Sequence, residues 1–302
     1  MPKIYIPCNK IKILPPGRKN AIEPVWRCSR VNDVVGKSIH ERTSIGLEKS
    51  MQMSFCGCFF FTLHSIEGFR SFFMKKNLII PQLSLAEKIL WAASSIGVTV
   101  LFFLVPDKNP LTLIATLVGV TSLLFTAKGH VSGQFLQLFF CVLYAIVSLG
   151  FKYYGEAITY MCMTFPSDLF AAIVWLKHPS KNGKTEVKIA HLTPKIATIT
   201  ILVSGAVTFI FYFILKALGT TNLNLSTVSI ATSMLASMLT IYRVPYYALA
   251  YATNDIVLIT MWTLASIANP AYIAMVFNFV IFLVNDIYGF ISWKKIRARQ
   301  ES

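Results

Sequence analysis

The chain has 302 residues, of which 55% are hydrophobic and 14% are charged, and its mean hydropathy is +0.61. These values exclude a soluble globular domain and are typical of an integral membrane protein. The net charge of +15 does not indicate nucleic-acid binding, because nearly all the lysines and arginines precede the first long apolar run, occupy gaps between runs, or follow the last one.

Residues 1–73 differ from the rest of the chain because they are basic and irregular, and their apolar patch over residues 55–63 is too short to cross a bilayer. The basic residues that follow this patch do not fit a signal peptide with a cleavage site. Two interpretations have equal weight: a disordered extension, or an artefact of the assigned start, since Met74-Lys75-Lys76-Asn77 is typical of a natural one. A weakly bound interfacial segment is a third.

Apolar runs then follow one another with short breaks, and each is long enough to cross a bilayer as a helix. They predict an all-α integral membrane fold with about eight transmembrane helices, at residues 89–105, 110–127, 131–150, 155–176, 196–218, 226–242, 246–268 and 272–293. Only the gap from Lys177 to Lys195 is a substantial loop, so we expect one membrane domain over residues 74–302. Lysine and arginine gather on one side of the predicted membrane, which predicts that both termini are cytoplasmic.

An internal repeat relates two parts of the chain at an offset of 118 residues (293 minus 175), which places Trp175 over Trp293. Four further pairs fall into line without a gap: Tyr144 with Trp262, Tyr154 with Tyr272, Asp168 with Asp286, and Lys177 with Lys295. The pairs predict two parallel three-helix repeats, 110–176 and 226–293, joined by a linker helix at 196–218 and preceded by one N-terminal helix. Three helices and a linker make an even number of crossings, so both repeats have the same orientation.

Polar residues within the apolar runs are candidates for a binding site, because a carboxylate or carboxamide inside a membrane is costly unless it faces a cavity or a partner. Helical spacing places several of them on shared faces, together with aromatic residues. The candidate substrate-binding residues are Gln134, Gln137, Tyr144, Asn254, Asp255, Trp262, Asn278, Asn285, Asp286 and Tyr288.

Such a set suits a flat, hydroxylated ligand. Aromatic faces stack on a heteroaromatic ring, more favourably if it is cationic, while amides and carboxylates bind carboxamide and ribose groups. Other interpretations stay open: the asparagines form hydrogen bonds between helices, Asp168 and Asp286 each have a structural role as a cap or in a pair, and Trp262 is part of the core. The aromatic residues near helix ends are expected in an interfacial belt: Trp175, Trp293, Tyr153 and Tyr154.

Signatures of catalysis or metal binding are absent from the sequence. The six cysteines form no metal pattern, Cys56-Gly57-Cys58 alone is weak evidence, and the five histidines are scattered without HExxH. GxxxxGK[ST] and GxSxG do not occur. We therefore predict no catalytic residue, no metal and no cofactor, and an integral membrane enzyme is the least favoured class.

Three sequences resemble the PnuC family of vitamin-precursor transporters: NDIVLITMW at 254–262, NFVIFLVNDIYGFISWKK at 278–295 and, more loosely, MTFPSDLFAAIVW at 163–175. The resemblance covers roughly residues 85–297. It implies a fold similar to that of SWEET sugar transporters and facilitated uptake of nicotinamide riboside, which a cytoplasmic kinase then traps by phosphorylation. Ala171, where the second repeat has Gly289, makes the first repeat a looser fit, and residues 1–73 have no counterpart in the family.

We therefore expect a multi-pass facilitative transporter in the cytoplasmic (plasma) membrane, whose partners are nicotinamide riboside and the lipid bilayer, with no nucleic acid. The sequence leaves a homo-oligomer open. A transporter of thiamine or riboflavin is the near alternative, and a proton-coupled transporter with Asp168, Asp255 and Asp286 as a relay is the alternative of another class. The riboside is preferred over the mononucleotide, because no arginine or lysine lies at mid-membrane depth to neutralise a phosphate.

Overall fold

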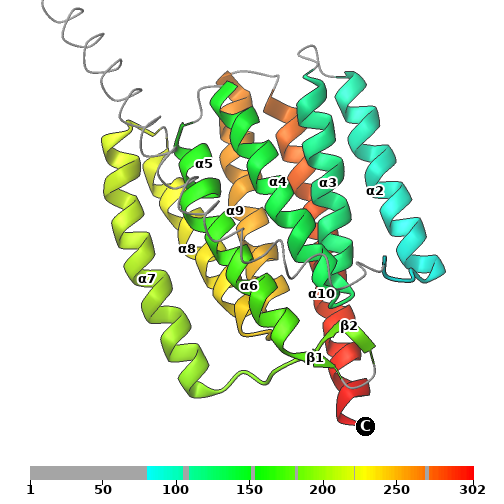
Figure 1. Cartoon of the computed structure of the whole chain (residues 1–302). Coiled ribbons are helices and arrows are strands. Elements are labelled where there is room, and N and C mark those ends of the chain that lie inside the picture. Colours follow the sequence, from blue (N-terminus) through cyan, green and yellow to red (C-terminus); the bar gives the residue numbers. More distant parts are fainter. Residues whose placement is uncertain (1–79, 105–108, 151–153, 181–182, 221, 269–271) are drawn as a thin grey trace, which may run out of the picture. The chain divides into compact units, whose positions relative to one another are not determined.

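The computed structural model describes residues 80–104, 109–150, 154–180, 183–220, 222–268 and 272–302, all within one compact unit (Figure 1). The expectations for residues 1–73 and for Tyr153 lie outside these ranges. The elements are α2 (Leu85–Leu104), α3 (Pro110–Ala127), α4 (Val131–Gly150), α5 (Tyr154–Thr159), the π-helical turn η1 (Tyr160–Thr164), α6 (Phe165–Lys177), β1 (Pro179–Ser180), β2 (Gly183–Val187), α7 (Pro194–Ala217), α8 (Leu223–Ile241), α9 (Tyr247–Ala268) and α10 (Ile273–Glu301).

Eight helical segments of the described chain are long and apolar enough to cross a membrane, with α5, η1 and α6 forming one continuous segment. This confirms the predicted all-α membrane fold, and most helix ends lie within a few residues of the expected ones. The chain is a multi-pass membrane protein.

Local capping explains where several helices begin. Ser84 and Glu87 form a capping box at the start of α2: the Ser84 backbone N–H donates to Glu87 Oε2 (2.6 Å), and the Glu87 N–H to Ser84 Oγ (3.4 Å). Asn109 caps α3 and Thr193 caps α7 through their side-chain oxygens, and each precedes a proline at the first helical position. After α3 the chain turns at Gly129, whose φ of 64° costs a glycine little.

The helices pack as two groups of three, α3 with α4 and α6, and α8 with α9 and α10. The last helix of each group packs against the first helix of the other, so α10 lies on α3 and α6 lies on α8 (Figure 1). The remaining two helices occupy corresponding seams: α2 contacts α3 and α10, while α7 contacts α8 and η1. This arrangement favours the interpretation of the chain as two three-helix repeats.

A core cluster closes the end of the bundle at which α10 finishes. It is built around Trp175 and Trp293, both 0% exposed, with Val187, Val244 and Ile296 packed beside them. The prediction that these two tryptophans lie in an interfacial belt is therefore wrong. They are buried because each indole lies against the other half of the protein, where its N–H finds a backbone acceptor.

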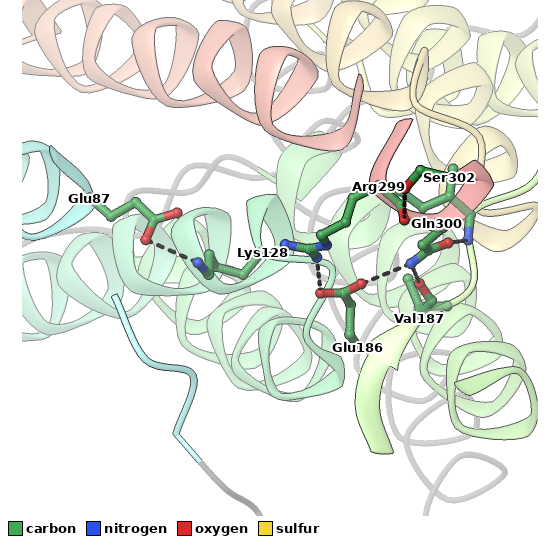
Figure 2. Close-up of polar contacts among 8 residues, drawn as sticks. Glu87, Lys128, Glu186, Val187, Arg299, Gln300 and Ser302 are labelled. Atoms are coloured by element: carbon green, nitrogen blue, oxygen red, sulfur yellow. Dashed lines mark hydrogen bonds and ion pairs between the residues drawn. The ribbon is translucent and has the colours of Figure 1, made fainter. Parts of the chain in front are cut away.

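The predicted loop between α6 and α7 contains a short antiparallel hairpin, β1 with β2, and residues 186–190 are held by three other segments. The Val187 N–H donates to Gly129 O (2.9 Å), and the Ala190 N–H donates to Arg243 O (3.0 Å). Figure 2 shows the third contact, in which Gln300 of α10 binds residues 186–189 beside an ion pair between Glu186 and Arg299. These contacts explain why α10 continues beyond its expected end at residue 293.

Candidate functional site

A cavity of about 480 Å³ receives side chains from α3 to α10, and its volume lies within the ~300–1,000 Å³ typical of small-molecule sites. At one end it is lined by Gly219 and Asn222, which are exposed, and by Tyr272, which precedes α10. At the other end it is lined by the buried Thr240 and Tyr247, beside the core cluster of Trp175 and Trp293. The cavity therefore opens at the end of the bundle remote from the C-terminus and is closed at the other.

Asn254 of α9 lines the cavity and is held in place by three hydroxyl groups of α8. Its Oδ1 accepts hydrogen bonds from Ser229 (3.0 Å), Thr232 (2.9 Å) and Ser233 (3.1 Å). The three donors stand at positions i, i+3 and i+4, which share one helix face. Because Oδ1 is occupied by these hydroxyls, the Nδ2 amide is the group that Asn254 offers to a ligand.

Three aspartates form an acidic level in the deeper part of the cavity. The carboxyl groups of Asp255 and Asp286 are within hydrogen-bonding range of each other, and each residue is 5% exposed. Asp168, 2% exposed, lines the same cavity from α6 and accepts a hydrogen bond from Cys141 Sγ (3.5 Å). Two ionised carboxylates are acceptors only, so the pair needs a shared proton or a donor from a ligand. Asp255 Oδ2 is buried and has no hydrogen-bond partner among the described residues.

Two glutamines add amide groups from α4. Gln137 Oε1 accepts a hydrogen bond from Ser122 Oγ (2.6 Å), which fixes its amide. Gln134 is 2% exposed, and its Oε1 has no hydrogen-bond partner within the part of the chain that the structure describes. A buried unsatisfied acceptor that lines a cavity is a natural contact for a ligand hydroxyl or amide.

Aromatic residues line the cavity toward its open end, where a smaller cavity of about 170 Å³ meets it. The rings of Trp262 and Tyr272 are 5.6 Å apart with an interplanar angle of 61°, and those of Phe140 and Tyr160 are 5.9 Å apart at 80°. Tyr160 begins η1, and such π-helical turns within helices are frequent at functional sites. The residues that line both cavities are Phe140, Glu156, Tyr160, Trp262, Tyr272, Phe279 and Phe282.

The structure brings most of the predicted site residues together. Those that line the larger cavity are Gln134, Gln137, Asn254, Asp255, Trp262 and Asp286. Tyr144 and Asn278 line the smaller cavity, which Trp262 also reaches.

Asn285 and Tyr288 line neither cavity. Asn285 Nδ2 donates to Ser94 Oγ of α2 (3.0 Å) and to Ile281 O (2.8 Å). Tyr288 OH donates to Glu87 Oε1 of α2 (2.7 Å), and Lys128 Nζ pairs with the other oxygen of the same carboxylate (3.2 Å; Figure 2). Both side chains hold α2 against α10. Asn285 therefore forms a hydrogen bond between helices, which is the alternative that the sequence left open for the asparagines.

Sequence reasoning missed several lining residues that carried a usable signal. Four serines of α8 line the cavity, and their spacing of three, four and four residues places them on one helix face: Ser226, Ser229, Ser233 and Ser237. Glu156, also missed, is a single acid near the start of an apolar run. Among the described lining residues none is lysine, arginine or histidine. Nor do the described residues contain a group of three metal-ligating side chains.

Comparisons with known proteins point in one direction. Residues 109–295 match the family described as "Nicotinamide mononucleotide transporter". The nicotinamide riboside transporter PnuC of Neisseria mucosa is 27% identical over 214 residues, which are 70% of this chain and 81% of that protein. The protein of the same name from Haemophilus influenzae is 25% identical over 213 residues, 70% of this chain and 91% of its own length. The crystal structure of the vitamin B3 transporter PnuC matches with a TM-score of 0.64 and 26% identity, covering 74% of this chain and 96% of that one.

Proposed function

Because the chain belongs to the nicotinamide mononucleotide transporter family, we propose that it carries nicotinamide riboside across the membrane by facilitated diffusion. The curated relatives are named for this substrate, although the family description names the mononucleotide. The two ligands differ by one phosphate, so the charge of the cavity bears directly on the choice between them.

The observation that carries the proposal is the lining of the cavity, which combines amides, hydroxyls, aromatic rings and carboxylates with no lysine, arginine or histidine among its described residues. Proteins bind phosphate with arginine, lysine or backbone N–H groups at helix N-termini. A phosphate beside Asp255 and Asp286 would lose its hydration and meet like charge. The riboside has the same ring and ribose hydroxyls, which suit the lining, and it has no phosphate, so it avoids this loss of hydration and this repulsion.

Calorimetry on the purified protein tests the choice of substrate. The panel is nicotinamide riboside, nicotinamide mononucleotide, thiamine and riboflavin. The riboside should bind tightest. Tighter binding of the mononucleotide would contradict the charge argument, and tighter binding of thiamine or riboflavin would assign the cavity to another vitamin.

We extend the proposal to the cellular setting. The protein spans the cytoplasmic membrane with both termini in the cytoplasm, does no chemistry itself, and delivers the riboside to a kinase whose phosphorylation maintains the gradient. In this orientation the cavity faces outward. In a cysteine-free background, an impermeant thiol reagent added outside should label Asn222→Cys and spare Lys177→Cys, both exposed positions. Labelling of Lys177→Cys alone would reverse the orientation.

One observation favours a second function. The facing carboxyl groups of Asp255 and Asp286 form the kind of site that holds a proton in proton-coupled transporters. Uptake into vesicles that contain the kinase and its nucleotide, with and without a protonophore, separates the two functions. A facilitator keeps its rate, whereas a proton-coupled transporter loses accumulation when the proton gradient collapses.

A further inference from the structure

We propose that Glu156 selects the charge of the ligand. Its carboxylate, among the aromatic rings where the two cavities meet, holds the positive charge of a cationic heteroaromatic ring. This inference rests on the proposed function, since the ring of nicotinamide riboside is such a cation. It names Glu156 as the residue that recognises the positive charge of the ring.

Glu156 is distinguished from the other described glutamates by its lack of partners. Glu87 accepts hydrogen bonds from Tyr288 and Lys128, and Glu186 pairs with Arg299. Glu301 pairs with Arg297 and His191. The Glu156 carboxylate makes no hydrogen bond or ion pair with another described residue, although it lines both cavities.

The surroundings of Glu156 suit a flat cation. Tyr160, one helical turn further, lies within electrostatic reach of Glu156, and its ring is 4.4 Å from that of Tyr144. The rings of Trp262 and Tyr272 line the same region of both cavities. Aromatic faces attract cations, and a carboxylate adds a full opposite charge. Neither cavity has a lysine, arginine or histidine among its described lining residues that could neutralise Glu156 in place of a ligand.

Glu156 is separate from the acidic level of the three aspartates. It precedes Asp168 by twelve residues (168 minus 156) on one continuous helical segment, about 18 Å at the helical rise of about 1.5 Å per residue. It also lies near the open end of the cavity, because the preceding residue, Gly155, lies against Leu215 and Thr220, beside Gly219. The carboxylate is therefore placed to meet a ligand before the aspartates do, and Tyr160, within electrostatic reach of both Glu156 and Asp255, lies between the two levels.

A structural role would explain the acid differently, because a glutamate in the first turn of a helix interacts favourably with the helix dipole. That role affects stability and is indifferent to the charge of the ligand. Only charge selection predicts that the loss of affinity depends on whether the ligand ring is cationic.

The experiment compares wild type, Glu156→Gln and Glu156→Asp in binding nicotinamide riboside and its dihydro form, which has nearly the same shape and a neutral ring. Glu156→Gln should weaken the cationic riboside about 10-fold or more, as expected for the loss of a charged partner, and change the neutral form less than about 2-fold. Glu156→Asp keeps the charge and should restore most of the preference. Glu301→Gln, the same exchange at the other end of the bundle, should change neither affinity.

Equal losses for the two ligands, or no loss for either, would overturn the role of Glu156 while leaving riboside binding intact. If wild type binds no riboside, the proposed function fails. The role of Glu156 is then tested with 1-methylnicotinamide and nicotinamide, which are a cationic and a neutral ring without ribose. A preference of wild type for the cationic ring that Glu156→Gln abolishes supports Glu156 by itself. Absence of that preference, or its persistence in Glu156→Gln, refutes the role.

Discussion

The indole rings of Trp175 and Trp293 lie against each other with centroids 5.3 Å apart, and each binds the first helix of the other group of three. Trp175 Nε1 donates to Thr240 O of α8 (2.9 Å), and Trp293 Nε1 donates to Thr126 O of α3 (2.8 Å). The two halves are thus joined by reciprocal bonds at the closed end of the cavity. This reciprocity is what two related repeats would produce.

Replacing either tryptophan by phenylalanine should lower stability by similar amounts. Trp175→Phe and Trp293→Phe keep a ring and each remove one N–H donor, which costs about 1 kcal/mol. The alanine variants should cost ~3–5 kcal/mol, because they also empty a buried site. Thermal unfolding in detergent measures both. Trp91→Phe is the comparison for an exposed position: Trp91 is 41% exposed and its Nε1 donates to Thr121 Oγ1 (3.1 Å), and this variant should cost less than either buried one. A large effect of one phenylalanine variant and none of the other would contradict the reciprocal arrangement.

The sequence predicts a repeat from one offset, but that offset does not extend to the first helices of the two groups. The offset of 118 relates Trp175 to Trp293, whereas their acceptors Thr126 and Thr240 are 114 residues apart (240 minus 126). The segments that follow α3 and α8 therefore differ in length. The burial of the two tryptophans also could not be predicted from the sequence. A tryptophan near a helix end usually lies in an interfacial belt unless another part of the chain covers it, and the sequence does not show that covering contact.

Asparagine substitutions distinguish the cavity from the bonds between helices. Asn254→Ala should weaken riboside binding by up to about 10-fold, the loss of one hydrogen bond. Two of its hydroxyl partners on α8, Thr232 and Ser233, also donate to backbone oxygens of their own helix and keep those bonds in the variant. Asn285→Ala should leave affinity unchanged and lower stability by about 1 kcal/mol, because it releases Ser94 of α2. Calorimetry and thermal unfolding on both variants measure the two effects. Loss of affinity in stable Asn285→Ala protein would return that residue to the site.

Whether a predicted site residue lines a cavity depends on what packs against its face of the helix. Asn254 and Asp255 face the cavity, as their shared helix face with Trp262 indicates. Asn285 and Tyr288 follow the same periodicity on α10, but α2 covers that face. Periodicity identifies a polar face and leaves open whether a cavity or another helix lies against it. Contacts with α2 depend on packing between distant segments, which a single sequence does not specify.

The segment 186–190 should loosen when Gln300 is removed. Gln300 Oε1 accepts from the Ile189 N–H (2.9 Å), and its Nε2 donates to Glu186 Oε1 (2.8 Å) and Val187 O (3.0 Å). Gln300→Ala removes all three bonds, each worth about 1 kcal/mol at most where the groups are partly exposed. Hydrogen exchange at Ile189 should therefore accelerate by roughly 5-fold to 100-fold. The control is Ser302→Ala, whose hydroxyl donates only to Arg299 O in the same helix, and unchanged exchange in Gln300→Ala would contradict the role of these bonds.

Trp262 lines both cavities, is only 4% exposed, and packs against Leu258, Met261 and Phe279. A ligand ring that stacks on its face should make Trp262→Ala lose about 5-fold to 150-fold in affinity, by analogy with stacking of bases on aromatic side chains worth ~1–3 kcal/mol. The same variant should lose ~3–5 kcal/mol of stability, because it also empties a core position, so alanine alone does not separate the two roles.

Trp262→Phe separates them, since it should keep the fold and much of the stacking, with a loss of less than about 5-fold in affinity. Trp293→Phe, in the core cluster at the closed end, is the matched control and should lower stability without changing affinity. Normal affinity in folded Trp262→Ala protein would show that this tryptophan supports the cavity wall and does not bind the ring.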